Sequence, residues 1–462
     1  MKKTEKVFCS ICLAILMFFF CTIIIRTVTR QVLVKHLGIN NVFTNVVLFD
    51  VQNINDGTNL GDGNGSGFDE ELHTTASVKV DWTALYPFSE EVLEEKAVEE
   101  KAERVDKLTS TIALLEGNVE TYTSNYLLGH KKLIEAANAY ENVIKWNYAP
   151  YSEYNGVITT SDGYLTSFYA LSDVSEIANA TISLAHFCRE NNTPFIYVNT
   201  PFKVCEYDDI DISGVTDFTN QNVNSFIDQL EDYGIDYFDL RKQLHAERLI
   251  HHELFFRTDH HWTPESGLWA ARTIADLLNA EYGFNFDVSL IEDVQFTSVL
   301  YPNWFLGSQG KKVTLSNTEP DDICLLYPNY PTKLHFELKT RGINTDGDFS
   351  ILYNMKQIDE CDYYNRSPYH TYSYGDQALE RIENKLVDNG NRLLLVHDSF
   401  GDCVIPFLSL GCQYLDAIDL RYFDGSLQSF ILQEKPDAVV ILYNPSQTRY
   451  SKVESGGLFD FR

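Results

Sequence analysis

The stretch Leu393-Leu394-Leu395-Val396-His397-Asp398-Ser399-Phe400-Gly401 ends a run of four aliphatic residues at a polar turn that carries a serine. A short aliphatic run bounded by a turn is typical of a buried strand. In sheets of parallel strands, ligands bind at the carboxyl ends of the strands, so Ser399 is expected where chemistry would occur. A short helix is expected after the turn, and its free N–H groups could stabilise an oxyanion. The alternative is a strand-ending turn in which Ser399 is only a cap.

A second stretch, Arg257-Thr258-Asp259-His260-His261-Trp262-Thr263-Pro264, brings an acid and two imidazoles together within three residues. In an extended segment alternate side chains point the same way, so Asp259 and His261 can face one crevice. Asp259 could then hold the imidazole of His261 in the tautomer that takes a proton from Ser399, as in a catalytic triad. The alternative is that the histidines pack or cap beside a buried Trp262.

A metal site is a third interpretation of this region, because five potential ligands lie close together in the sequence: His251, His252, Asp259, His260 and His261. Metal sites usually draw their ligands at helical or hairpin spacing. Adjacent histidines in an extended strand point to opposite faces, so they cannot both face one ion. We therefore predict no metal site, and a triad requires no cofactor.

From about residue 155 the chain alternates helical and strand patterns. Predicted helices span residues 174–190, 223–233, 264–281, 378–388 and 427–434, and predicted strands span residues 194–199, 235–239, 392–396 and 438–443. Thr263 followed by Pro264 is typical of a helix start. Strands separated by helices of this length imply crossover connections and a mainly parallel sheet covered on both faces. We therefore predict an α/β fold.

These motifs resemble the DHHW family, which is named after Asp259-His260-His261-Trp262. They also resemble the wider set of SGNH-like proteins typified by alginate O-acetyltransferases and related in fold to GDSL esterases. The resemblance covers roughly residues 150–450, and its motifs occur in order: Asp162-Gly163-Tyr164-Leu165, Pro201-Phe202-Lys203, Asp239-Leu240, Thr258 to Thr263, and Asp398-Ser399-Phe400. It implies an SGNH three-layer α/β/α (flavodoxin-like) sandwich. It also implies Ser399 as nucleophile, His261 as general base and Asp259 as the orienting acid.

Two departures from the GDSL pattern stand out. The acid and the histidine are separated by one residue, as in the alginate-type group, whereas GDSL-type enzymes separate them by two. The glycine that is usual before Asp-Ser is His397 in this chain. A bulkier residue at that position could narrow the site or indicate lost catalysis.

The N–H group of Ser399 is the first candidate for an oxyanion donor. Further candidates for binding the oxyanion or the substrate are Lys203, Ser308, Gln309, Arg421 and Asn444. Ser308 and Gln309 belong to the glycine-flanked loop 307–310. Each candidate has a structural alternative: ion-paired surface groups for Lys203 and Arg421, and turn formation for Asn444 and the loop.

Residues 7–25 form an uninterrupted apolar run, long enough to span a bilayer as a helix. Lys2, Lys3 and Lys6 precede it, which predicts a cytoplasmic N-terminus and a C-terminal body outside the cell membrane. A cleaved signal peptide is the alternative. We favour the uncleaved anchor because the run is long and residues 22–26 offer no small-residue cleavage site.

The remaining organisation follows from composition. Residues 1–30 form the cytoplasmic tip and transmembrane anchor, residues 31–88 a flexible tether, residues 89–148 a helical stalk or packing helices, and residues 149–462 the SGNH-like catalytic domain. Apolar residues three and four apart between residues 105 and 126 predict a coiled coil that could join two copies. A helix that packs on the main domain is the alternative.

The net charge of the chain is −30, which argues against nucleic acid as a partner because the protein would repel phosphates. We expect a membrane-anchored extracytoplasmic serine enzyme, an O-acetyltransferase or acetylesterase that acts on a cell-surface polysaccharide. The resemblance also implies a membrane acyl-donor protein as a partner. The same triad serves transfer and hydrolysis, so both stay open. The alternative is a non-catalytic, membrane-tethered carbohydrate-binding or polysaccharide-assembly protein that keeps the fold.

Overall fold

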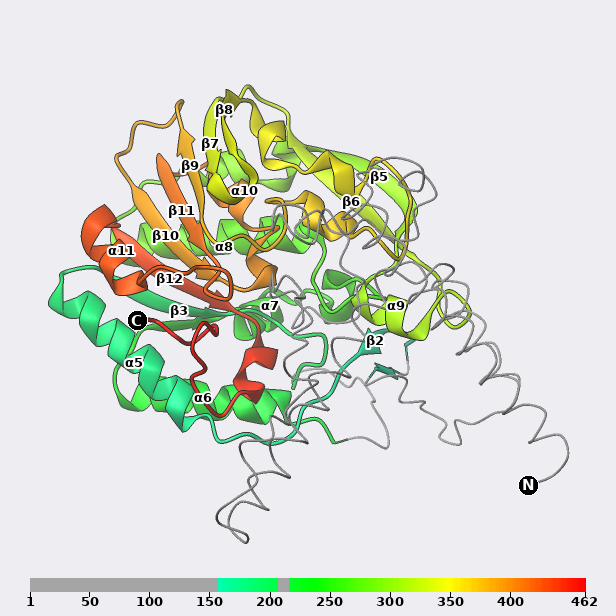
Figure 1. The fold of residues 1–462 in the computed structure, drawn as a ribbon, viewed down its shortest axis with the longest axis horizontal. Coiled ribbons are helices and arrows are strands. Elements are labelled where there is room, and N and C mark those ends of the chain that lie inside the picture. Colours follow the sequence, from blue (N-terminus) through cyan, green and yellow to red (C-terminus); the bar gives the residue numbers. More distant parts are fainter. Residues whose placement is uncertain (1–156, 161, 207–215) are drawn as a thin grey trace, which may run out of the picture. The chain divides into compact units, whose positions relative to one another are not determined.

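The computed structural model describes residues 157–160, 162–206 and 216–462 (Figure 1). The predicted anchor at residues 7–25, the tether at 31–88 and the stalk at 89–148 lie outside the described residues, so they stay predictions. Within the described part of the chain, no helix combines the length and the apolar character needed to cross a membrane. The six cysteines of this part are all free thiols.

An eight-stranded sheet forms the centre of the described structure, with strand order β4-β3-β12-β10-β11-β9-β7-β8 (Figure 1). Five neighbouring strands run parallel: β4 (Tyr237–Asp239), β3 (Phe195–Asn199), β12 (Ala438–Tyr443), β10 (Arg392–His397) and β11 (Tyr414–Ile418). Three strands complete the sheet in antiparallel pairing: β9 (Glu380–Asn384), β7 (Leu334–Leu338) and β8 (Ile343–Gly347).

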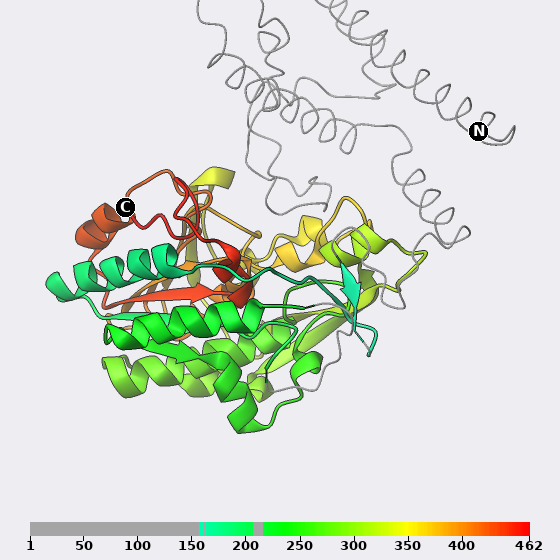
Figure 2. The ribbon, with the colours of Figure 1, turned by 90° about the horizontal axis from the view of Figure 1, so that it is seen from below.

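Helices cover both faces of the sheet (Figures 1 and 2). One face carries α5 (Ser175–Glu190), α6 (Thr219–Asp232) and α11 (Leu427–Glu434), and the other carries α7 (Leu240–Glu247), α8 (Pro264–Tyr282) and α10 (Ile405–Leu408). Successive side chains of a strand point to opposite faces. In β12, Val439 and Ile441 therefore pack in one hydrophobic core, and Val440 and Leu442 pack in the other. The predicted three-layer α/β/α arrangement is confirmed.

The prediction of a mainly parallel sheet is wrong, because the sheet is mixed. Residues 380–384, predicted as part of a helix, form β9 and pair antiparallel with β11. Glu380, Ile382 and Asn384 are buried while the residues between them are half-buried, the alternation of a strand whose two faces differ. β7 and β8 extend this part as a hairpin that turns at Gly342, whose φ of +65° favours glycine.

Smaller elements surround the sheet. β5 (Phe296–Phe305) and β6 (Asp321–Pro328) form a separate antiparallel ribbon, β1 (Ile158–Thr159) and β2 (Leu165–Thr166) form another, and α9 (Ser308–Val313) follows β5. The 3₁₀ helices are η4 (His251–Leu254), η5 (Val288–Ile291), η6 (Asp293–Gln295), η7 (Lys339–Arg341), η8 (Phe349–Leu352), η9 (Met355–Gln357), η10 (Pro368–Thr371), η11 (Ser399–Gly401) and η12 (Pro445–Arg449).

A group of buried acids lies where the parallel and antiparallel parts of the sheet meet. Arg421 forms ion pairs with Asp419 at 2.6 Å and with Asp376 at 2.8 Å. Glu380 and Asp402 are fully buried, and their carboxyl oxygens have no hydrogen-bond partner in the part of the chain that the structure describes. Burial, together with neighbouring carboxylates, raises the pKa of both groups well above the usual range. Burial therefore favours the neutral acid form of both side chains in the folded protein.

Replacing Glu380 by glutamine tests this assignment. Because the pKa of Glu380 is higher in the folded than in the unfolded chain, its contribution to stability is greatest at acid pH and is lost as pH rises. Glu380→Gln removes the ionisation and keeps the shape. We expect it to increase the free energy of unfolding by about 1–3 kcal/mol at pH 8, with a smaller difference towards pH 4, as measured by denaturant titration.

The matched control is Glu383→Gln, on the same strand but half-buried, which should change stability by less than about 0.5 kcal/mol. If Glu380→Gln were less stable than the wild type at both pH values, the carboxylate would have a stabilising partner and the assignment would be wrong.

Candidate active site

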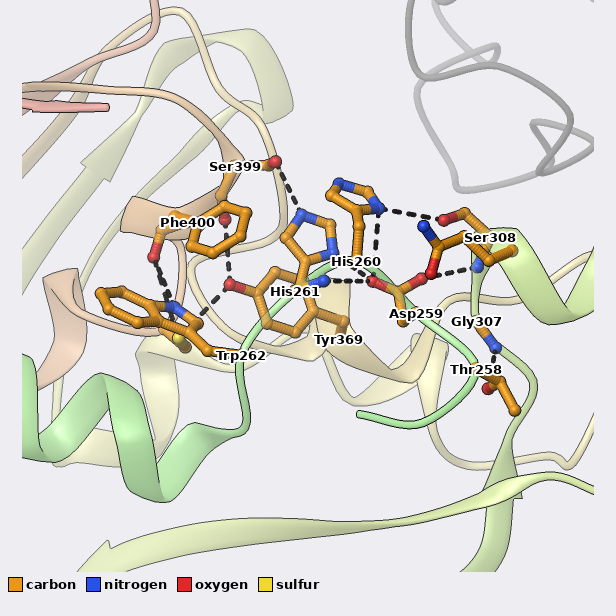
Figure 3. A network of polar contacts seen from close by, with 12 residues as sticks. Thr258, Asp259, His260, His261, Trp262, Gly307, Ser308, Tyr369, Ser399 and Phe400 are labelled. Atoms are coloured by element: carbon orange, nitrogen blue, oxygen red, sulfur yellow. Dashed lines mark hydrogen bonds and ion pairs between the residues drawn. The ribbon is translucent and has the colours of Figure 1, made fainter. Parts of the chain in front are cut away.

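Ser399, His261 and Asp259 form one line of hydrogen bonds at the carboxyl end of β10 (Figure 3). Nε2 of His261 lies 2.6 Å from Oγ of Ser399, and Nδ1 lies 2.5 Å from Oδ1 of Asp259. All three residues are buried. A carboxylate only accepts hydrogen bonds, so Nδ1 carries the hydrogen and Nε2 accepts one from the Ser399 hydroxyl. This tautomer is the one in which an imidazole can take a proton from a serine.

The turn that carries Ser399 is fixed by Asp398. Oδ1 of Asp398 caps η11 by accepting a hydrogen bond from N–H of Phe400 at 3.1 Å, and Oδ2 accepts from N–H of Asn444 at 2.8 Å and from Nε2 of Gln447 at 3.0 Å. Burial raises the pKa of Asp398, and these hydrogen bonds oppose the rise. No described residue accepts a hydrogen bond from the N–H group of Ser399.

Both carboxylate oxygens of Asp259 accept hydrogen bonds. Oδ1 also accepts a hydrogen bond from N–H of His261 at 3.0 Å, and Oδ2 accepts from N–H of Ser308 at 2.5 Å. Burial by itself would raise the pKa of Asp259, but the rings of His261 and His260 and the hydrogen bonds from His261 hold that pKa well below its usual range. Asp259 is therefore ionised and can stabilise a protonated imidazole.

The loop 307–310 reaches Asp259 because residue 307 is glycine. A Cβ atom at Gly307 would lie 2.3 Å from Cβ of Asp259. N–H of Gly307 donates to Oγ1 of Thr258 at 2.9 Å, and N–H of Gly310 donates to the Thr258 carbonyl at 2.7 Å. The close approach of the two main chains is what lets Ser308 donate to the carboxylate.

Two aromatic residues fix the imidazole and the serine turn, and sequence reasoning did not find one of them. Tyr369 stacks on His261 with ring centroids 4.1 Å apart, and its hydroxyl donates to the Ser399 carbonyl at 3.0 Å. Nε1 of Trp262 donates to the Phe400 carbonyl at 3.0 Å. Tyr369 lies in η10, in an irregular segment between β8 and β9 whose only signal is its richness in tyrosine.

His260 lies at the edge of the site, where Nδ1 is 3.0 Å from Oγ of Ser308. The rings of His260 and His261 lie 3.8 Å apart, contrary to the expectation that they face opposite ways, because the chain bends here instead of forming a regular strand. Asp259, His260 and His261 could thus offer three ligand atoms within 4.8 Å to a metal. Both ring nitrogens of His261 are already hydrogen-bonded to Asp259 and Ser399, so a metal would have to displace one of these bonds.

Four of the five further candidates serve structural contacts. Nζ of Lys203 donates to the carbonyl of Asp259 and to Oε1 of Gln309 at 3.3 Å. Arg421 is committed to the ion pairs described above. Oδ1 of Asn444 accepts from N–H of Ser446 at 2.9 Å, and its Nδ2 donates to the Pro201 carbonyl at 3.3 Å. Only Ser308 touches both Asp259 and His260.

The His397 side chain is accommodated inside the fold. Its ring is fully buried, and Nδ1 donates to the Asp398 carbonyl at 2.8 Å. A Cβ atom at position 401 would lie 2.5 Å from this ring, so Gly401 provides the space that the imidazole occupies. The absence of a side chain at Gly401 thus compensates for the departure from the usual glycine at position 397.

Comparisons with known proteins agree with this geometry. Residues 179–289 match the family model described as SGNH hydrolase-like domain, acetyltransferase AlgX, and residues 237–415 match the model described as DHHW protein. The first match includes Asp259 and His261, and the second includes Ser399 as well. A comparison with curated protein sequences found no match.

Two solved structures share the fold. The structure of Bacillus cereus PatB1 with a sulfonyl adduct has a TM-score of 0.53 and 20% identity, covering 66% of this chain and 98% of PatB1. The crystal structure of a DHHW family protein from Eubacterium siraeum has a TM-score of 0.50 and 18% identity, covering 67% of this chain and 97% of that protein. The family-model matches confirm the resemblance to DHHW proteins and to the AlgX-type domain, and the two structures support an SGNH-like α/β fold.

Proposed function

We propose that this protein is a serine acyl-ester enzyme that uses Ser399, His261 and Asp259 to handle acetyl groups on a cell-surface polysaccharide. The observation that carries the proposal is the unbroken line of hydrogen bonds from Asp259 through His261 to Ser399. The match to a family model described as an acetyltransferase supports acetyl as the acyl group. The polysaccharide rests on the resemblance to alginate O-acetyltransferases.

In the first half-reaction, Oγ of Ser399 attacks the acetyl carbonyl while Nε2 of His261 takes the hydroxyl proton. Asp259 stabilises the imidazolium that forms. The N–H group of Ser399, which no described residue uses, donates to the oxyanion. The C–O bond to the leaving alcohol then breaks, the alcohol takes the proton from His261, and the acetyl group stays on Ser399.

In the second half-reaction, an acceptor hydroxyl or water gives its proton to His261 and attacks the acetyl carbonyl. Ser399 leaves and takes the proton back, so the enzyme returns to its starting state. The same groups serve acetyl transfer to a sugar and hydrolysis by water. Exclusion of water from the acetyl-enzyme decides between the two reactions.

Loss of the nucleophile is the direct test. We expect Ser399→Ala in the full-length chain to reduce hydrolysis of an activated acetyl ester by at least about 10³-fold. Intact-mass analysis should find one acetyl group on the wild type and none on the variant. Ser183→Ala, on the exposed face of α5, is the control and should match the wild type. A folded wild type with neither turnover nor adduct would favour the carbohydrate-binding alternative.

The contact between Gly307 and Asp259 gives a second test. In Gly307→Ala, a methyl group 2.3 Å from Cβ of Asp259 must displace the carboxylate from His261, so we expect turnover to fall about 100-fold. The rate at which a sulfonyl fluoride labels Ser399 should fall in parallel. Ser308→Ala keeps the N–H donor to Asp259, so its turnover should fall much less. Unchanged turnover in a folded Gly307→Ala would show that the position of Asp259 is not required.

We also propose that residues 7–25 anchor the protein in the cell membrane, with the N-terminus in the cytoplasm and the catalytic domain outside. A stalk at residues 89–148 would join two copies near a membrane acyl-donor protein. After alkaline extraction of membranes, the protein should remain in the pellet at full length, because a spanning helix is not released by alkali. A shorter, soluble form would instead identify the apolar run as a cleaved signal peptide.

A further inference from the structure

Lys203 is a buried ammonium group beside the candidate triad. Lys203 is 1% exposed and lies in the loop that follows β3. Nζ donates to the Leu165 carbonyl in β2 at 2.6 Å, to the Asp259 carbonyl, and to Oε1 of Gln309 in α9 at 3.3 Å, and it lies 3.5 Å from the Arg257 carbonyl. One cation thus binds oxygens from three separate parts of the fold.

Asp321, the first residue of β6, holds the same segment through its amides. Oδ1 of Asp321 accepts a hydrogen bond from N–H of Arg257 at 3.1 Å. Oδ2 accepts from N–H of Thr258 at 2.7 Å and from its hydroxyl at 2.6 Å. A cation therefore binds the Asp259 carbonyl, and an anion accepts from the amides of Arg257 and Thr258.

This segment needs such support because it belongs to no regular element. An isolated bridge between Phe255 and Trp262 is the β pairing that flanks it. Buried main-chain groups without partners are costly. N–H groups of Leu165 and Gly310 bind the carbonyls of Arg257 and Thr258, whereas the Asp259 carbonyl accepts from the Lys203 side chain. The side chain of Asp259 can meet His261 only if its own main chain is held in place.

We propose that Lys203 and Asp321 form a charged clamp that positions Asp259 and His261 for reaction, and that the clamp works only while Lys203 carries its proton. Both are positioning residues, since neither touches Ser399 or a reacting atom. This inference rests on the proposed function. It also gives Lys203 a role other than the oxyanion contact that the sequence suggested.

The chemistry of the contacts requires both charges. Every polar contact of Lys203 is an acceptor, so a neutral amine would turn its lone pair towards a carbonyl oxygen. Every contact of Asp321 is a donor, which suits a carboxylate. The other ionisable groups that face Lys203 are Asp162 and Tyr164 in the β1–β2 turn and the carboxylate of Asp259.

Burial makes the charge of Lys203 sensitive to pH. Burial lowers the pKa of Lys203 to about 7, although Asp259, Asp321 and Asp162 oppose this effect. Lys203 is therefore protonated below that pH and loses its proton above it, so activity should decline on the alkaline side. An arginine at this position would stay charged throughout, because its guanidinium does not titrate in this range.

The test is the pH profile of kcat/KM for an activated acetyl ester between pH 6 and pH 9, using the full-length wild type, Lys203→Arg and Lys203→Met. We expect an alkaline decline in the wild type and a much weaker one in Lys203→Arg. Lys203→Met should lose about tenfold or more below pH 7, mainly in kcat, and its difference from the wild type should narrow as the pH rises. Lys242→Met, at an exposed lysine of α7, should reproduce the wild-type profile.

A wild-type profile that stays flat from pH 7 to pH 9 would overturn the clamp, and this outcome needs no variant. An equal alkaline decline in wild type and Lys203→Arg would overturn it too. If the lysine variants fail to fold, Asp321→Asn tests the anionic half of the clamp. The asparagine amide has one acceptor oxygen, so it cannot replace both carboxylate oxygens of Asp321. A kcat equal to that of the wild type in this variant would count against the clamp. Failure of the proposed function is distinguishable, since the wild type itself would then show no Ser399-dependent turnover.

Discussion

The structure depends on hydrogen bonds to the main-chain N–H and C=O groups of residues 257–259, a segment that lies outside any helix or strand. The amides of Arg257 and Thr258 donate to Asp321, and the Asp259 carbonyl accepts from Lys203. Oγ1 of Thr258 accepts from N–H of Gly307. Because these partners come from β6, from the loop after β3 and from the start of α9, the segment can be held only when those distant parts have packed together. The line from Asp259 to Ser399 is thus a consequence of tertiary structure and not of local conformation.

The two parts of the sheet contribute differently to this arrangement. The parallel strands end together and present Ser399 and Asn444 at one edge. The antiparallel part, with the chain that connects β8 to β9, supplies Tyr369 on the imidazole. It also buries Glu380 beside β11, where an ionised carboxylate without a partner would be unfavourable. The extension that sequence analysis did not foresee is therefore part of the structural support of the site.

Strong local patterns were predictable, and long-range ones were not. The aliphatic runs at 392–396 and 438–443 predict strands that the structure confirms as β10 and β12, and Thr263-Pro264 marks the start of α8. Residues 378–388 were misassigned because β9 has the sequence Glu-Arg-Ile-Glu-Asn, whose single apolar residue gives no alternation that would mark a strand. Tyr369 and Asp321 carry no local signal, since their roles arise from contacts with residues more than 29 positions away. Ser399, His261 and Asp259 could be singled out because chemistry restricts which residue types can serve together.

The buried cations of the described region are turned towards the protein. Lys203 and Lys311 donate to carbonyl oxygens, and Arg241 is paired with Asp239. The half-buried Arg421 is paired with Asp419. An acetyl ester is neutral and develops negative charge only as the serine attacks, so fixed N–H dipoles stabilise the transition state more than the ground state. A cation at the same place would also bind a carboxylate product and hold it in the site. The candidate oxyanion donor is the main-chain N–H group of Ser399, and the cations named above bind other groups of the protein. This arrangement suits a neutral ester better than an anionic substrate.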